Sequence, residues 1–304
     1  MLYKHRIFLA ITLGSAIGFI NLYIHLNFPI PNDFFLPHCG ARQIIEGLDP
    51  YSCPTHGNAS SPFTTIIALM PFAWLPLEGA SAIIIGVSSG LLAYTLNRPN
   101  EPWRLLVFLS VPFIYSVQVS QWAPLFLAAV YLKWLYPIIL VKPHLGLSFF
   151  IMNFTYRRFI LVALLGIGTL VIWPDWIFRW WQQASGYDGF IPLLSFSGLL
   201  LLLAILRWRT LPARWLILVS LTPQRAWYDQ LMLWTIPSNR NQMIVLTVCS
   251  WIMWLPYIIL APQNLGIYDN LWLTVSLYYP ALAIVLLNKE PGKDAKAQKQ
   301  ISAV

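Results

Sequence analysis

The chain has 304 residues, of which 58% are hydrophobic and only 10% are charged. Soluble domains carry about 25% charged residues, so this composition excludes an ordinary soluble protein and predicts an all-α polytopic membrane protein. The formal net charge is +8. It does not indicate nucleic-acid binding, because the basic residues lie mostly between apolar segments, as in the positive-inside pattern of membrane proteins.

Apolar segments recur along the whole chain, and we expect them to form a bundle of about 10–12 transmembrane segments. The candidates are 7–26, 62–77, 79–97, 104–118, 121–136, 137–152, 158–173, 192–206, 212–222, 226–237, 243–260 and 270–288. Several are too short to cross a membrane alone and are expected to be half-helices or re-entrant pieces that line a cavity. No repeat of fixed period is visible, so residues 1–288 are expected to form a single transmembrane domain.

The distribution of basic residues predicts the orientation of the chain. Basic residues precede the first segment, and residues 289–304 form a basic tail that is expected to be disordered. Because an even number of segments leaves both termini on one side, we expect a multi-pass plasma-membrane protein with cytoplasmic N- and C-termini. The loops 27–61 and 174–191 then lie outside, and Gln121 falls on the inner side.

The loop 27–61 holds three of the 11 acidic residues of the chain. We expect a short interfacial helix in it that starts with Asp33 as N-cap, carries Pro37 in its first turn and ends at Gly47. Asp49-Pro50-Tyr51 follows and is typical of a turn. Carboxylates at a membrane surface often have a chemical role, but a cap for Asp33 and a turn residue for Asp49 are the structural alternatives.

His38, Arg42 and Glu46 recur every four residues in this expected helix and would share one face. Apolar residues cover much of the remaining surface. We therefore expect a helix that lies in the membrane surface with its polar face toward an aqueous cleft. The alternative for Arg42 and Glu46 is an ion pair between neighbouring turns of the helix.

Several short motifs follow one another along the chain. An Asp followed by aromatic residues comes after the first segment, and Gly47-Leu48-Asp49-Pro50-Tyr51 comes next. Further along lie Pro62-Phe63 with Trp74-Leu75-Pro76, Ser110-Val111-Pro112 with Ser120-Gln121-Trp122, Lys142-Pro143-His144, and Leu221-Thr222-Pro223 with Trp227-Tyr228-Asp229. Over about residues 30–150 and 220–235, this series resembles glycosyltransferase family 87, whose members are C-type membrane glycosyltransferases that use polyprenyl-phosphate sugars.

The chain departs from the family pattern at several positions. Ser120 stands where the family usually has Gly, Thr222 stands in place of Ser, and Tyr228 and Asp229 stand where one branch of the family has histidines. A catalytically inactive relative is therefore one alternative. Another is a lipid or solute transporter or flippase, which should show repeat symmetry between its halves.

The resemblance implies an enzyme with a C-type glycosyltransferase-like bundle. It would move a hexose, such as mannose, from a polyprenyl-phosphate donor to a lipid or glycan acceptor at the outer membrane face. The family's catalytic Asp corresponds to Asp33, which would act as base in an inverting direct displacement. No cofactor, metal ion or nucleic acid is expected to take part, and membrane lipids are the other expected partners.

A departing phosphate needs positive charge beside it, and we expect Lys142 or Arg225 to supply that charge. Lys142 lies inside an apolar run, where a lysine is costly without a partner. His144 and Arg42 are further candidates. The structural alternatives are a membrane-interface anchor for Arg225 and a hydrogen-bonded core histidine for His144.

The remaining candidates for substrate binding are polar residues of the same motifs: His38, Asp49, Tyr51, Gln121, Tyr228 and Asp229. Gln121 is at odds with the expected topology, which places it on the side of the membrane opposite to Asp33. Asp229 is expected to have a structural or substrate-orienting role, paired with Arg225 one helical turn back.

Tryptophans and cysteines mark the outer loops. The segment 173–188 is dense in tryptophan, which favours an interfacial anchor over a sugar-stacking platform. Cys39 and Cys53 share the first outer loop, and they are expected to be either a disulfide or two free thiols. Cys249 lies in an apolar run and is expected to be a packing residue.

Overall fold

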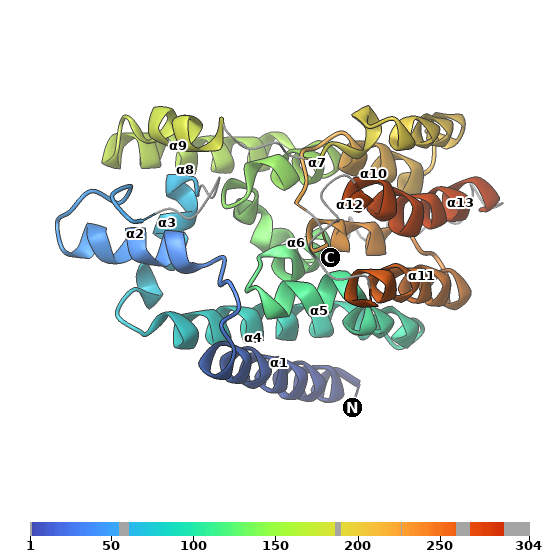
Figure 1. The fold of residues 1–304 in the computed structure, drawn as a ribbon, viewed down its shortest axis with the longest axis horizontal. Helices are drawn as coiled ribbons and strands as arrows, with labels where there is room; N and C mark the ends of the chain where they lie inside the picture. The colour runs from blue at the N-terminus through green and yellow to red at the C-terminus, as the bar shows by residue number, and fades with distance from the viewer. Residues whose placement is uncertain (1, 55–60, 186–189, 226, 260–267, 289–304) are drawn as a thin grey trace. The chain divides into compact units, whose positions relative to one another are not determined.

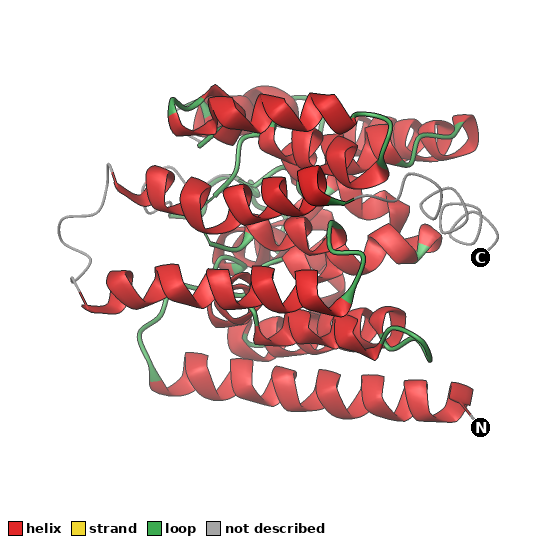
Figure 2. Cartoon of the chain, turned by 90° about the vertical axis from the view of Figure 1, so that its right-hand side faces the viewer, coloured by secondary structure: helices red, strands yellow, loops and turns green. Residues whose placement is uncertain are grey.

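The structure is a computed structural model that describes residues 2–54, 61–185, 190–225, 227–259 and 268–288. Within these ranges the chain is helical and contains no β-strand, apart from an isolated bridge between Phe190 and Gln224 (Figure 2). The all-α fold class is therefore confirmed. The basic tail 289–304 lies outside the described residues.

The α-helices are α1 (Leu2–Asn27), α2 (Phe35–Ile45), α3 (Phe63–Leu69), α4 (Leu77–Leu96), α5 (Val111–Gln118), α6 (Ala123–Tyr131), α7 (Pro143–Met152), α8 (Tyr156–Ile172), α9 (Trp176–Ala184), α10 (Leu211–Ser220), α11 (Arg240–Ile259), α12 (Tyr268–Leu273) and α13 (Tyr279–Leu287) (Figure 1). The 3₁₀-helices are η1 (Met70–Phe72), η2 (Pro102–Leu109), η3 (Lys133–Leu140), η4 (Pro192–Leu194), η5 (Ser197–Arg207) and η6 (Asp229–Thr235). A short π-helix, η8 (Thr274–Tyr278), joins α12 to α13.

The chain divides into two compact units. The first contains residues 3–94 and 116–188, and the second contains residues 95–115 and 189–304. The candidate residues from Asp33 to His144 belong to the first unit. The expectation of a single transmembrane domain stays a prediction.

Among the residues that the structure describes, two helices are long and apolar enough to cross a membrane, namely Lys4–Asn27 within α1 and Leu77–Leu96. α8 and α9 make a third if they count as one span, although the chain bends by 97° between them. Several other apolar helices are shorter, because non-helical residues such as Ser110 and Lys142 interrupt the predicted segments. These helices indicate an α-helical membrane protein, and the count of about 10–12 crossings stays a prediction.

α9 occupies part of the region 174–191, for which the sequence predicted an outer position but no helix. The outer position stays a prediction. The helix is strongly amphipathic: Arg179, Gln182 and Gln183 share one polar face, and aromatic residues occupy much of the rest. Among these aromatic residues, Trp176 is buried, whereas Phe178 and Trp181 are exposed. Such a pattern is typical of a helix that lies on a surface. The density of tryptophan was visible in the sequence, but it did not distinguish a helix from a loop.

α1 and α4 pack against each other in antiparallel directions through small residues (Figure 1). A Cβ atom on Gly14 of α1 would lie 2.7 Å from the carbonyl oxygen of Gly86 in α4, so the two backbones are in direct contact. Nearer the start of α1, the Arg6 guanidinium donates to the carbonyl oxygen of Tyr94 over 2.7 Å. This register places the beginning of α4 beside the end of α1.

The antiparallel pair does not fit the expectation that segment 62–77 crosses the membrane, because a crossing there would make α1 and α4 run parallel. The apolar helical stretch in this segment covers Phe63–Phe72. The α-helix α3 with the 3₁₀ turn η1 reaches about 16 Å, which is about half the thickness of the hydrocarbon core. We therefore expect the chain between α1 and α4 to begin and end on one side of the membrane.

α2 matches the helix expected after Asp33, with Pro37 in its first turn and Gly47, at φ +72°, just beyond its end. Asp33 does not cap this helix. The N-cap residue is Phe34, whose N–H donates to the side-chain oxygen of Asn32 over 3.0 Å. The expectation of an Asp33 cap is wrong because Asn32, one residue earlier, makes the local turn.

The expected polar face of α2 is wrong in part. His38 is only 4% exposed, whereas Ile45 is 60% exposed. The side that carries His38 is buried because α2 packs on α3 and η1. Arg42 and Glu46 are both exposed, and in the part of the chain that the structure describes no ion pair joins them.

A disulfide joins Cys39 of α2 to Cys53, with the two Cα atoms 6.2 Å apart. Of the two alternatives expected for these cysteines, the disulfide is therefore confirmed and the pair of free thiols is wrong. Cys249 is a free cysteine of intermediate exposure. The bridge holds the turn around Asp49 against α2, and closing a loop of this size stabilises the fold by about 3 kcal/mol in the chain-entropy model.

Candidate functional site

Three of the predicted site residues form one chain of hydrogen bonds in the first unit. The side-chain amide of Gln121 donates through Nε2 to Oδ2 of Asp33. The same amide accepts through Oε1 from Nζ of Lys142 over 3.2 Å. Gln121 therefore links a carboxylate to an ammonium group, using both ends of its amide.

The backbone brings these three residues together from distant parts of the sequence. The N–H of Asp33 donates to the carbonyl oxygen of Val119 over 2.9 Å, which fixes the start of α2 beside the turn before α6. Lys142 is the residue just before α7. The hydroxyl of Thr65 on α3 donates to the carbonyl oxygen of Val141 over 2.5 Å, which fixes the position of the backbone next to Lys142.

Lys142 and Gln121 are buried, with 9% and 5% of their surfaces exposed, and Asp33 is partly exposed. A buried ammonium group needs hydrogen-bond acceptors, and Lys142 has one in Gln121. The contact between Gln121 and Asp33 also corrects the expected topology, which placed them on opposite sides of the membrane. Counting segment 62–77 as a link on one side of the membrane, and not as a crossing, removes this conflict.

Three residues that the sequence analysis did not propose as site residues lie beside this cluster. Ser120 has a φ of +57°, and its hydroxyl contacts two side chains of α1: it accepts from Nδ2 of Asn21 over 3.0 Å and lies 2.9 Å from Nε2 of His25. A pair of polar residues four apart inside an apolar span was the available signal. Such residues are costly in a membrane and mark functional or structural polar contacts.

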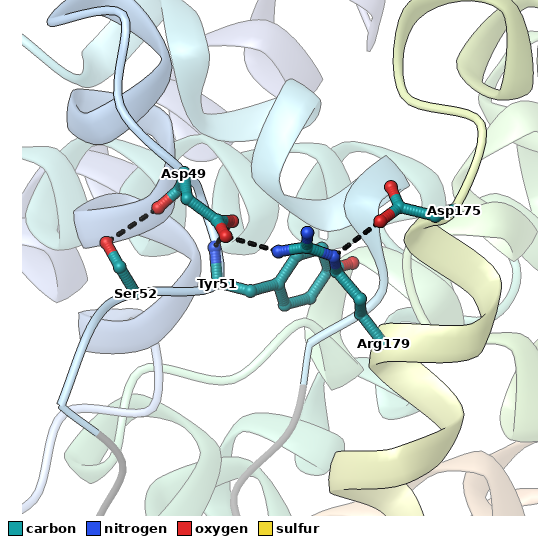
Figure 3. A network of polar contacts seen from close by, with 5 residues as sticks. All are labelled: Asp49, Tyr51, Ser52, Asp175 and Arg179. Atoms are coloured by element: carbon teal, nitrogen blue, oxygen red, sulfur yellow. Dashed lines mark hydrogen bonds and ion pairs between the residues drawn. The ribbon is translucent and has the colours of Figure 1, made fainter.

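Asp49 lies in a second polar network, at the surface of the first unit (Figure 3). Arg179 of α9 forms an ion pair with Asp49 through Nη1 and donates through Nε to Asp175 over 2.6 Å. The carboxylate of Asp49 also accepts from the backbone N–H of Tyr51 over 2.9 Å, and its carbonyl oxygen accepts from the hydroxyl of Ser52 over 2.7 Å. The predicted turn is thus confirmed, and Asp49 holds α9 to it.

The aromatic residues of this region pack on α3. The ring of Phe63 lies 6.1 Å from that of Trp173 and 6.4 Å from that of Trp176, measured between centroids. Trp176 is therefore a packing residue, whereas Trp181, 66% exposed, fits the anchor that the sequence favoured. The phenol of Tyr51 is half-buried, and this burial raises its pKa.

The other candidates of the first unit take different positions. The imidazole of His38 donates through Nε2 to the carbonyl oxygen of Leu75 over 3.1 Å, since a carbonyl can only accept. Burial lowers the pKa of this imidazole. His38 thus has the contacts of a structural residue. Arg42 is exposed on α2, and His144 lies half-buried in the first turn of α7, two residues after Lys142.

Arg225, Tyr228 and Asp229 lie in the second unit. The fully buried carboxylate of Asp229 accepts from the backbone N–H of Arg225 over 2.8 Å. Tyr228 stacks on Tyr115, with ring centroids 6.0 Å apart. The hydrogen bond from Arg225 to Asp229 therefore orders the turn at Trp227, whose φ is +75°. This agrees with the structural role expected for Asp229.

A buried network that the sequence did not reveal adjoins this turn. Gln224 accepts through its side-chain oxygen from the hydroxyl of Tyr278 and from the amide of Gln230. Its own amide nitrogen donates to the carbonyl oxygen of Val219. Single glutamines in apolar segments gave no spacing pattern that could have grouped them.

The fold and the first cluster together define an α-helical membrane protein with a hydrogen-bonded Asp–Gln–Lys cluster, of which Gln121 and Lys142 are buried and Asp33 is partly exposed. No protein-family model, no curated protein and no solved structure matches the chain.

Proposed function

We propose that this chain is a membrane glycosyltransferase that moves a hexose from a polyprenyl-phosphate donor to a hydroxyl group of a lipid or glycan acceptor. The observation that carries the proposal is the hydrogen-bonded chain from Asp33 through Gln121 to Lys142. It gives one site both a proton acceptor and a cation. The motifs that resemble glycosyltransferase family 87 include all three residues.

The reaction needs these two groups at the same centre. Asp33 takes the proton of the acceptor hydroxyl as its oxygen bonds to C1 of the sugar. The bond between C1 and the phosphate oxygen breaks, and its electron pair stays on the phosphate. Lys142 stabilises the charge that develops there. A single displacement of this kind inverts the configuration at C1.

Gln121 has a supporting role in this scheme. Its amide hydrogen-bonds both the carboxylate and the ammonium group and so fixes the position of each. It also orients both toward the substrate. A buried lysine acts on phosphate as a point charge, and its position therefore matters more than the direction of its donors.

A lipid-linked donor fits an α-helical membrane protein whose polar cluster lies beside long apolar helices. α1 carries the apolar surface expected of a lipid-facing span, and the same helix contacts the cluster through Asn21 and His25. The disulfide between Cys39 and Cys53 favours an oxidising outer face for this site. We therefore propose transfer at the outer face of the plasma membrane.

The test is transfer of labelled mannose from polyprenyl-phosphate mannose by purified protein, with a membrane lipid extract as acceptor. We expect one polyprenyl phosphate released per sugar transferred, with inversion at C1. Lys142→Met should weaken donor binding about tenfold or more, because a charge-assisted phosphate contact is lost. Lys133→Met is the matched control, since Lys133 is a partly exposed residue of η3 and should bind donor as the wild type does.

The second candidate cation is Arg225, and Arg225→Met is measured in parallel. If donor affinity is intact in both Lys142→Met and Arg225→Met, the phosphate site lies elsewhere. Donor binding without any transfer, over a range of acceptors, would support a catalytically inactive relative. Absence of both binding and transfer would overturn the proposed function.

A further inference from the structure

Ser120 adopts a backbone conformation that is unusual for serine. Its φ is +57°, in the left-handed region that glycine enters readily and other residues enter at a cost. The residue is also completely buried. A strained, buried residue of this kind persists only where the surrounding structure holds it in place.

Two side chains of α1 supply that restraint. Asn21, which is itself fully buried, donates through Nδ2 to the Ser120 hydroxyl over 3.0 Å and to the carbonyl oxygen of Val117 over 2.6 Å. His25 contacts the same hydroxyl over 2.9 Å. Asn21 and His25 are four residues apart and therefore share one face of the helix. Together these two side chains hold the turn between α5 and α6 in place.

The residues on both sides of Ser120 contact the Asp–Gln–Lys cluster. Val119 accepts the backbone N–H of Asp33, and Gln121 hydrogen-bonds the side chains of Asp33 and Lys142. The left-handed residue between them sets the direction in which Gln121 leaves the turn. A change of φ at Ser120 would swing Gln121 away from at least one of its two partners.

We propose that Ser120 is a positioning residue. Asn21 and His25 hold it in place, and it directs the side chain of Gln121 toward Asp33 and Lys142. Its effect on transfer rests on the proposed function, whereas its effect on the cluster does not. The serine hydroxyl carries this role. If only the backbone conformation mattered, glycine would adopt it without strain and serve at least as well.

The test compares Ser120→Gly with Ser88→Ala. In the first variant, glycine can still adopt the left-handed conformation of the turn, but both side-chain contacts with α1 are lost. The second removes a buried hydroxyl of α4 that donates only within its own helix, to the carbonyl oxygen of Ile84 over 2.6 Å. Ser120→Gly should still fold, because relief of the left-handed strain offsets much of the loss of the two buried hydrogen bonds.

Two readouts then follow the position of Gln121. The kcat for transfer should fall about tenfold or more in Ser120→Gly, with KM for the donor within about twofold, as expected for misplaced reacting groups. In the protein without substrate, the Lys142 amine should react several-fold faster with an acylating reagent, measured by mass spectrometry, because Gln121 no longer holds it. Ser88→Ala should match the wild type in both readouts.

The double variant Asn21→Leu/Ser120→Gly tests whether the two residues act through one shared contact or through two separate ones. Its kcat should be no lower than that of the worse single variant, because both changes break the same contact. An additive loss, or a Ser120→Gly enzyme with wild-type kcat and unchanged Lys142 reactivity, would overturn the inference. If the wild type shows no transfer, the proposed function fails. The reactivity of Lys142 then still decides whether Ser120 positions Gln121.

Discussion

Gln121 shows how one neutral side chain can organise two charged ones. Its amide has a donor and an acceptor, and it uses the first on Asp33 and the second on Lys142. A glutamate here would place a second carboxylate against Asp33, and a leucine would leave the buried Lys142 without this acceptor. We therefore regard the amide as a requirement of the site.

His38 makes the stability of the protein depend on pH. Burial lowers the pKa of its imidazole in the folded state, so the folded protein resists protonation at His38. In the unfolded chain the imidazole has its usual pKa of about 6.5. The contribution is therefore intact above about pH 6.5, and stability falls as the pH drops below that value toward the lowered pKa. Thermal unfolding measured between pH 7.5 and 5 should show this decline.

The matched variant for this prediction is His38→Gln, whose amide can still donate to the carbonyl oxygen of Leu75 but does not titrate. We expect a lower Tm than the wild type at pH 7.5, from imperfect packing, and a flatter pH dependence. An identical slope in wild type and variant would show that other groups cause the decline.

At the scale of elements, the contact between α1 and α4 depends on the absence of side chains. Gly14→Ala would place its Cβ 2.7 Å from the carbonyl oxygen of Gly86, so the helices must separate. We expect a loss of about 1–3 kcal/mol in the free energy of unfolding, as for other overpacked contacts. Denaturation in mild detergent measures it.

Gly166→Ala in α8 is the control, because nothing lies within 4 Å of the added Cβ. That substitution should leave stability unchanged or raise it by up to about 1 kcal/mol, since alanine favours a helix. Equal stability changes for the two substitutions would contradict the close contact between α1 and α4.

The sequence predicted most elements but not their interruptions. Long apolar runs located α1 and α4, and Pro37 with Gly47 located α2, because composition and turn chemistry act locally. The non-helical residues Ser110 and Lys142 split other runs into short pieces, which hydropathy alone does not reveal. α9 was missed because its tryptophans and charges indicate a surface without indicating a backbone conformation.

The candidate site was predicted residue by residue but not as a set. Asp33, Gln121 and Lys142 were all named from motifs, yet the contact between Asp33 and Gln121 joins positions far apart in the chain and has no periodic signature. Ser120, Asn21 and His25 were missed because their roles depend on the left-handed turn at Ser120 and on the packing of α1. Such features arise only in the folded chain.

At the scale of the whole molecule, one revision of the topology up to residue 121 reconciles it with the contact between Asp33 and Gln121. If the chain between α1 and α4 stays outside, α4 runs inward, and the loop after it lies in the cytoplasm. Arg98 and Arg104 then follow the positive-inside pattern. The next crossing returns the chain to the outer side, where Gln121 meets Asp33.

This topology predicts the location of Asn100, an exposed residue of the loop after α4. In a Cys249→Ser background, Asn100→Cys should react with a membrane-impermeant maleimide only after the cells are permeabilised. The earlier count, with segment 62–77 as a crossing, predicts labelling of intact cells. Labelling without permeabilisation would therefore restore that count and contradict the revision.

The central claim is that Asp33 is the base of a sugar transfer, and the turnover of Asp33→Asn tests it most directly. Asparagine still offers an oxygen to Gln121 and is close in size, so the fold and donor binding should survive, but it cannot take a proton. We predict a fall in kcat of about 10²–10⁴ with donor affinity unchanged, and activity near wild type for the surface control Asp175→Asn. Turnover of Asp33→Asn at the wild-type rate would contradict the account.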